Sequence, residues 1–146
     1  MKLKVQLLKE CDKAQIQALD KISNDDIALF FDEPGCSGFE NLSLYGLFLD
    51  NKLIGYCFLA NIFPFQECCN YTYFDEQKSF ILGSVFVHPE HRKNGYGSYM
   101  VKEAIKMKTK GESKDIYLLL SDLDTSKFYN KLGFKMFEEG FMVKHL

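Results

Sequence analysis

Three features that mark other classes of protein are missing from this 146-residue sequence: a long apolar run, a dense basic run and a secretory leader. No stretch approaches the ~20 apolar residues that a membrane-spanning helix needs, so no membrane association is expected. The formal net charge is −2, and without a basic run we expect no large nucleic-acid-binding surface. The start of the chain, Met1–Val5, is followed by neither an apolar stretch nor a small-residue cleavage site, which predicts a cytoplasmic protein.

The cysteines do not form a metal-binding or disulfide pattern. Their number is odd, no Cys-x-x-Cys pair occurs, and adjacent cysteines are poorly spaced to bind one zinc ion together. We therefore expect five reduced thiols. His88 and His91 are two possible metal ligands, but no third ligand lies near them in the sequence, so we interpret them as solvated turn residues and expect no metal. The cysteines are Cys11, Cys36, Cys57, Cys68 and Cys69.

The composition that remains is that of an ordinary globular domain. Hydrophobic residues make up 47% and charged residues 26% of the chain, and 146 residues are enough for one full core. No repeat, low-complexity segment or linker divides the sequence. Residues 1–146 are therefore expected to form a single domain.

Apolar periodicity predicts the order strand, two helices, three strands, helix, strand, helix and two strands. Asn24 or Asp25 is expected to cap the second helix, which ends at Pro34-Gly35, and Asp50-Asn51 to form a hairpin turn. Residues 61–79 show no clean period and are either an extended hairpin tip or a loop over a ligand. The expected strands are 2–9, 43–49, 53–60, 80–87, 115–120, 134–137 and 141–143; the other expected helices are 12–22, 96–109 and one capped by Asp124 or Thr125 that stops at Gly133.

This order predicts an α/β fold with one mixed sheet. The segment 80–120 reads as a βαβ unit, so its two strands are expected to be parallel with a right-handed crossover. The hairpins before and after it are expected to add antiparallel strands at both ends. In the first helix, Ile16, Leu19 and Ile22 are expected to face the core together.

The most informative stretch is a glycine-rich turn between the strand at 80–87 and the helix at 96–109. Glycines there allow close approach of a ligand, and the backbone N–H groups at the start of the following helix attract an anion. The pattern favours a site for a phosphate or pyrophosphate, and the alternative is a tight turn that needs glycine only for its dihedral angles. A P-loop is not indicated, because no Lys-Ser or Lys-Thr pair follows the glycines. The turn reads Arg92-Lys93-Asn94-Gly95-Tyr96-Gly97-Ser98.

Three blocks of the sequence together resemble the GCN5-related N-acetyltransferase (GNAT) superfamily. Val85–Gly97 is similar to its strand, proline turn and Arg/Gln-x-x-Gly-x-Gly/Ala signature. Asp115–Leu120 is similar to the strand beyond the crossover, and Lys127–Phe134 to the Phe-Tyr-x-x-x-Gly-Phe ending. The order of elements also agrees from end to end. The resemblance implies a GNAT-like sheet whose two central strands splay apart.

The resemblance also implies acetyl-CoA as the co-substrate. The glycine turn would bind its pyrophosphate through backbone N–H groups, and the pantetheine arm would pair with the central strand like an added strand. An Asn that contacts the coenzyme in many relatives is replaced here by Asp122, which puts that contact in doubt. The residues implied to bind the coenzyme are Val85, Phe86, Val87, Arg92, Lys93, Asn94, Gly95, Tyr96, Gly97, Ser98 and Asp122.

Tyr129 is similar in position to the family's usual general acid. A phenol keeps its proton up to pH ~10 and can protonate the thiolate of coenzyme A as it leaves. The alternative is an aromatic core residue beside Phe128. The Glu that relatives often carry on the central strand is missing, Ser84 cannot act as a base at neutral pH, and Asp75 or Glu76 is a possible replacement.

The resulting hypothesis is an acetyl-CoA-dependent N-acetyltransferase with a primary amine acceptor on a small molecule, a peptide or a protein, acting as a monomer or homodimer. The alternative is a non-catalytic CoA-binding sensor or interaction module of the same fold. In the superfamily, the segments corresponding to 25–39 and 64–78 set the acceptor. Both segments contain acids and aromatic residues, which would suit a cationic amine, or these residues form a solvated acidic surface with core aromatics.

Overall fold

The computed structural model describes residues 2–33, 41–61, 79–120, 125–138 and 141–146, apart from the side chains of residues 137 and 138. Within them, seven strands form one mixed sheet in the order β1-β2-β3-β4-β5-β7-β6. Every neighbouring pair is antiparallel except β4 and β5, which are parallel. The strands are β1 (Leu3–Leu7), β2 (Ser43–Leu49), β3 (Lys52–Asn61), β4 (Ser79–Val87), β5 (Asp115–Leu119), β6 (Lys135–Glu138) and β7 (Phe141–His145).

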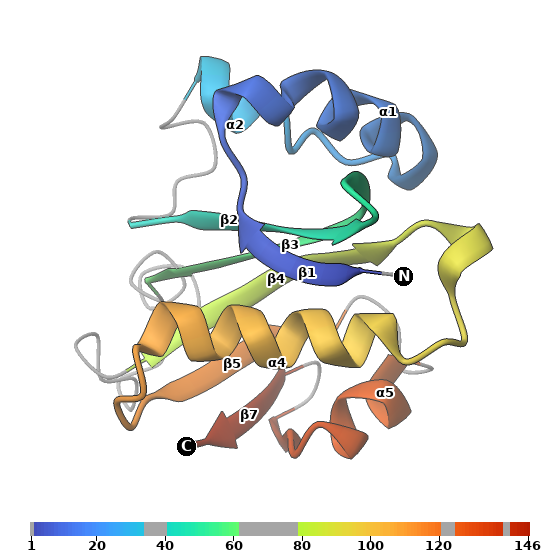
Figure 1. Cartoon of the computed structure of the whole chain (residues 1–146). Helices are drawn as coiled ribbons and strands as arrows, with labels where there is room; N and C mark the ends of the chain where they lie inside the picture. Colours follow the sequence, from blue (N-terminus) through green and yellow to red (C-terminus); the bar gives the residue numbers. More distant parts are fainter. Residues whose placement is uncertain (1, 34–40, 62–78, 121–124, 139–140) are drawn as a thin grey trace.

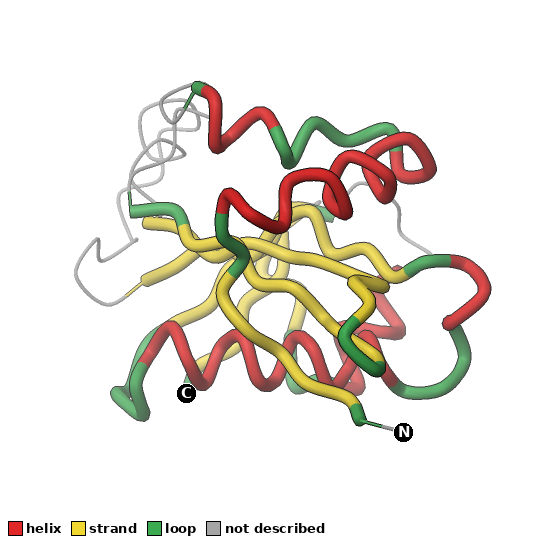
Figure 2. Tube along the Cα trace, turned by 45° about the horizontal axis from the view of Figure 1, so that its top comes forward, coloured by secondary structure: helices red, strands yellow, loops and turns green. Residues whose placement is uncertain are grey.

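Helices cover both faces of the sheet. In Figure 1, α1 and α2 lie on one side of the strands, and α4 and α5 lie on the other. The turned view in Figure 2 shows the sheet between these two layers. None of the described helices is both long and apolar enough to cross a membrane. The helices are α1 (Lys13–Ser23), α2 (Leu29–Asp32), α4 (Tyr96–Thr109) and α5 (Ser126–Lys131), with two short 3₁₀ turns, η1 (Glu10–Asp12) and η2 (Pro89–His91).

The predicted α/β architecture and its central βαβ unit are confirmed. Strands β4 and β5 are parallel and are joined through α4, which spans the predicted residues 96–109. The helix ends where Lys110 and Gly111 adopt left-handed conformations, with φ of 53° and 79°. The predicted hairpin turn is also present: Asp50 and Asn51 have φ of 50° and 70°, as a two-residue turn with right-handed strand twist requires.

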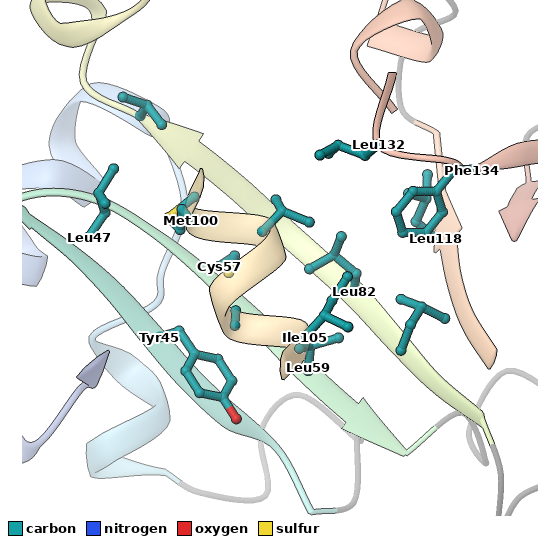
Figure 3. Packing of buried hydrophobic residues seen from close by; sticks show 14 of the residues in the cluster. Tyr45, Leu47, Cys57, Leu59, Leu82, Met100, Ile105, Leu118, Leu132 and Phe134 are labelled. Carbon is teal, nitrogen blue, oxygen red and sulfur yellow. The ribbon is translucent and has the colours of Figure 1, made fainter. Parts of the chain in front are cut away.

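Two apolar clusters, one on each face, hold the layers together. The cluster under α1 and α2 includes Ile16 and Leu19, which are fully buried as predicted from their spacing. The cluster under α4 joins Met100 and Ile105 of that helix to residues of the central strands, such as Cys57 and Leu82 (Figure 3). Cys57 is a buried free thiol and Cys11 an exposed one, whereas Cys36, Cys68 and Cys69 lie outside the described residues.

The connection between α1 and α2 differs from the prediction. Asn24 does not cap a second helix; it ends α1 in a left-handed conformation with φ of 64°. The second helix is four residues long and begins only at Leu29. Ile22, expected in the core, is 46% exposed, because α1 ends at the next residue and the chain turns away. A distant carboxylate, Asp20, takes the place of the expected cap by accepting hydrogen bonds from the backbone of the connection.

The two central strands separate as the fold prediction requires. Pairing between β4 and β5 runs from Ser79 opposite Asp115 to Leu82 opposite Leu118 and then stops. The rest of β4, residues 83–87, keeps its pairing with β3 but has no partner strand on the β5 side within the described chain. We call these residues the open segment. A bulge begins it, since Ser84 has φ of 51° and Cys57 of β3 has no paired residue in β4.

Candidate active site

The glycine turn leads from the open segment directly into α4. Lys93 and Gly95 both adopt left-handed conformations, with φ of 66° and 77°, and Gly95 is the N-cap of the helix. The first N–H groups of any helix lack an intrahelical acceptor, and here no side chain of the cap supplies one. The backbone N–H groups of Tyr96, Gly97 and Ser98 are therefore available to an anion, and the helix dipole adds to the attraction.

The two glycines of the turn have different surroundings. A Cβ atom on Gly95 would have no described atom within 4 Å, so the space beside this residue is open. A Cβ on Gly97 would lie 3.3 Å from the ring of Phe128 and 3.7 Å from Val87. Gly95 thus leaves room for a ligand at the helix start, whereas Gly97 allows α4 to pack closely against α5 and the end of β4.

Side chains of the turn brace its backbone. The Arg92 Nε donates to the carbonyl oxygen of Val87 at 2.8 Å, and its guanidinium carbon lies 5.3 Å from the centre of the Phe86 ring. The Asn94 side-chain amide donates to the carbonyls of His91 and Arg92 at 3.2 and 3.3 Å. These contacts tie the turn to the last residues of the open segment, so the start of α4 and the free strand edge are held next to each other.

The side chains of the two histidines before the turn make local contacts. The Nδ1 atom of His88 accepts a hydrogen bond from the Glu90 backbone N–H at 3.1 Å, which caps η2. The His88 and His91 rings meet edge to face, with centres 5.8 Å apart. In the part of the chain that the structure describes, no three His, Cys, Asp or Glu side chains come together as metal ligands would.

Tyr129 lies on α5, half-buried between two other rings. Its ring centre is 5.0 Å from that of Phe128 and 5.8 Å from that of Phe134, both near edge to face. Burial, with a smaller contribution from the nearby Cys57 thiol, raises the pKa of Tyr129 to about 12. No described residue forms a hydrogen bond with its hydroxyl. This phenol keeps its proton over the whole physiological pH range.

Other residues predicted from the sequence lie elsewhere. Asp122, Asp75 and Glu76 are outside the described residues. Of the two segments expected to face the acceptor, 64–78 lies wholly outside them, whereas 25–33 of the first segment is described. Asp32, at the end of α2, forms an ion pair with Lys13 at 2.5 Å. A polar network around Tyr56 of β3 was not predicted. Its only sequence signal was a tyrosine in an otherwise apolar central strand.

The buried phenol and thiol groups of this protein predict that its stability depends on pH. Burial raises the pKa of Tyr45, Cys57, Tyr117 and Tyr129 above their ordinary values of 10 for the phenol and 9 for the thiol. Above about pH 9, the unfolded chain therefore releases protons that the folded protein still holds. The free energy of unfolding must then fall as pH rises. Urea unfolding at pH 7.5, 9 and 10.5 should show a progressive loss; equal stability at all three values would contradict the burial of these groups.

Comparison with known proteins identifies a family whose model matches the chain. The model of the Acetyltransferase (GNAT) domain matches residues 41–136. No curated protein sequence matches the chain. Solved structures are similar in fold: the PaiA N-acetyltransferase of Thermoplasma acidophilum in complex with coenzyme A has a TM-score of 0.67 and 18% identity over 100% of both chains.

Two further solved structures resemble the chain to a similar degree. A GNAT family acetyltransferase from Brucella melitensis in complex with acetyl-CoA has a TM-score of 0.67 and 15% identity, covering 99% of this chain and 88% of its own. AAC(6')-Iy, in complex with the bisubstrate analogue CoA-S-monomethyl-acetylneamine, has a TM-score of 0.71 and 18% identity over 94% of each chain. At these identities the likeness concerns the fold.

Proposed function

The chain belongs to the GNAT acetyltransferase family, and from that premise we propose that it is an acetyl-CoA-dependent N-acetyltransferase that acts on a primary amine. The acceptor amine belongs to a small molecule, a peptide or a protein. The observation that carries the proposal is that the glycine turn at the start of α4 directly follows the open segment of β4. Tyr129 packs against the same apolar cluster as Val85 of that segment. Binding of a thioester-linked nucleotide would use the turn and the open segment, and transfer of its acyl group would use the hydroxyl of Tyr129.

The coenzyme would bind along this continuous surface. The turn Arg92–Ser98 would hold the pyrophosphate, with the N–H groups at the start of α4 as the main donors. Val85, Phe86 and Val87 would pair through their backbone with the amides of the pantetheine arm, as a strand would. Their free edge faces away from β3, on the side where pairing with β5 has ended. Asp122 would stand near the coenzyme's polar arm.

The chemistry would be direct transfer. The neutral amine attacks the thioester carbonyl, the C–N bond forms, and the C–S bond breaks to release a thiolate. Tyr129 donates its proton to that thiolate and later regains one from solvent. The second proton, lost by the attacking nitrogen, passes to water or to a base. Ser84 cannot be that base at neutral pH, and an amine that arrives deprotonated needs none. Holding both substrates in one geometry supplies much of the rate.

Two of the structural relatives support this choice of substrates. The Brucella melitensis protein is in complex with acetyl-CoA, and AAC(6')-Iy is in complex with a bisubstrate analogue that contains both CoA and acetylneamine. For the present chain we propose a soluble cytoplasmic enzyme, monomeric or homodimeric, that needs no metal. The second candidate function is a CoA-binding sensor without turnover, which the same turn and open segment would serve equally well.

Turnover separates the two candidates. The purified protein would be given acetyl-CoA and a panel of amines: a diamine, an aminoglycoside, an amino acid and a lysine-containing peptide. Release of free thiol above the rate without amine, together with acetylated product in mass spectra, supports the enzyme. Tight CoA binding by calorimetry with no product from any amine supports the sensor. Absence of CoA binding would contradict both.

A further inference from the structure

Tyr56 is a fully buried tyrosine on strand β3, and its hydroxyl has several polar partners. The oxygen lies 2.8 Å from Asp20 Oδ1, to which it donates, and 2.5 Å from the Ser23 Oγ. It is also 3.4 Å from Asp25 Oδ2. Its side chain points to the face of the sheet covered by α1 and α2. One hydroxyl thus links the sheet to the end of α1 and to the connection that follows it.

Asp20 extends this link into the backbone. Its two carboxylate oxygens accept hydrogen bonds from the N–H groups of Ile27 and Ala28, at 3.2 and 3.0 Å. The Ser23 hydroxyl in turn accepts from the N–H of Asp25 at 3.1 Å. Residues 24–28, which have no regular secondary structure, are therefore positioned largely by side-chain hydrogen bonds that converge on Tyr56. A phenylalanine would fill the same space but would lose the hydroxyl contacts with Asp20, Ser23 and Asp25 that anchor these bonds to the sheet.

The network lies beside the open segment. Tyr56 is paired in register with Phe86, one of the open-segment residues, and the two ring centres are 5.7 Å apart. Phe86 is in turn covered by the guanidinium of Arg92 from the glycine turn, 5.3 Å from its ring centre. Contacts therefore run without interruption from the connection 24–28, through Tyr56 and Phe86, to the turn proposed to bind the pyrophosphate.

The elements of the proposed site are divided between the two faces of the sheet. The glycine turn, α4 and Tyr129 lie on one face, together with the second apolar cluster. Ile27 and Ala28 of the connection 24–28 lie over the opposite face, in the apolar cluster that also contains Tyr117 of β5 and against which Phe86 of the open segment packs. An amine that attacks a thioester held beside the open segment must arrive from a side that the coenzyme does not fill. The face that carries the connection is linked to the open segment through Tyr56 and Phe86.

Resting on the proposed transferase function, we propose that Tyr56 is a positioning residue for the acceptor, and that through Asp20 and Ser23 it fixes residues 24–28 as one wall of the acceptor site. The wall carries the half-buried carboxylate of Asp25. Burial raises the pKa of this group, since the ionised form is poorly solvated there.

The test compares two buried tyrosines in Tyr56→Phe and Tyr45→Phe. Tyr45 is 3% exposed on β2, also has a hydroxyl bonded to a serine, and faces the opposite cluster. Each variant loses one buried hydroxyl with little change in shape. With the best amine of the panel, Tyr56→Phe should raise the acceptor KM about tenfold, the effect of about 1.4 kcal/mol. The dissociation constant for CoA should change less than about twofold, and Tyr45→Phe should leave the acceptor KM unchanged.

Further variants keep the test decisive. Ser23→Ala removes a single partner of the hydroxyl and should raise the acceptor KM in the same direction by a smaller factor. Hydrogen exchange at the amides of Ile27 and Ala28 should be faster in Tyr56→Phe than in wild type. An unchanged acceptor KM in a folded Tyr56→Phe variant, or an equal rise in Tyr45→Phe, overturns the inference while wild-type turnover upholds the proposed function. Absence of turnover by the wild-type protein overturns the proposed function, and the inference with it.

Discussion

Replacing Tyr129 by phenylalanine is expected to lower kcat about 10²-fold while leaving the affinity for coenzyme A nearly unchanged. The substitution keeps the ring, and with it the edge-to-face contacts with Phe128 and Phe134. It removes only the proton that would be donated to the leaving thiolate. Loss of a general acid typically costs 10²- to 10⁴-fold, and water that enters the opening would replace part of the effect. Steady-state kinetics with calorimetry of CoA binding would measure both quantities.

The pH profile adds an independent check on Tyr129. Burial raises the pKa of this phenol to about 12, so its deprotonation should not lower kcat at pH 9 or 10. Any change in rate over that range should then be the same in the wild type and in Tyr129→Phe. Tyr45→Phe is a matched control, because Tyr45 is a buried tyrosine on the same face that takes no part in the proposed chemistry. An unchanged kcat in Tyr129→Phe, with chemistry shown to be rate-limiting, would assign Tyr129 to packing.

The parts of the fold that the sequence predicted are those set by local chemistry. The bounds of α4 were predictable because Gly95 precedes the helix and Lys110-Gly111 ends it, all in left-handed conformations. The hairpin at Asp50-Asn51 follows from the tolerance of these two residues for positive φ. Both features depend on a few consecutive residues. The same holds for the glycine turn itself, which is why the candidate site could be located before its geometry was known.

The features that the sequence did not reveal depend on contacts between distant residues. Asn24 and Asp25 have the residue types of helix caps, yet the connection they belong to is held by Asp20 and, through it, by Tyr56 of β3. The bulge at Ser84 has no local signal either, since serine has no preference for positive φ. It is imposed by the pairing of β4 with β3, and it coincides with the separation from β5.

The role of the glycine turn in binding coenzyme A can be tested with two alanine substitutions at the ends of the same helix. Gly95 precedes α4 and Gly111 follows it; their φ angles are 77° and 79°, and a Cβ added to either would have no described atom within 4 Å. An alanine at either site is strained by about 1–2 kcal/mol in the left-handed conformation, so both variants should lose similar stability. They differ in what the new methyl group meets when a ligand is present.

In Gly95→Ala, the methyl group would enter the open space at the start of α4, where the pyrophosphate is proposed to bind. We expect the dissociation constant for CoA, measured by calorimetry, to rise about tenfold or more, as the loss of a charge-assisted set of hydrogen bonds would produce. Gly111→Ala should bind CoA as the wild type does. Gly97→Val is a less direct test, because its side chain would first meet Phe128. Equal CoA affinity in folded Gly95→Ala and Gly111→Ala would show that Gly95 is needed only for the conformation of the turn.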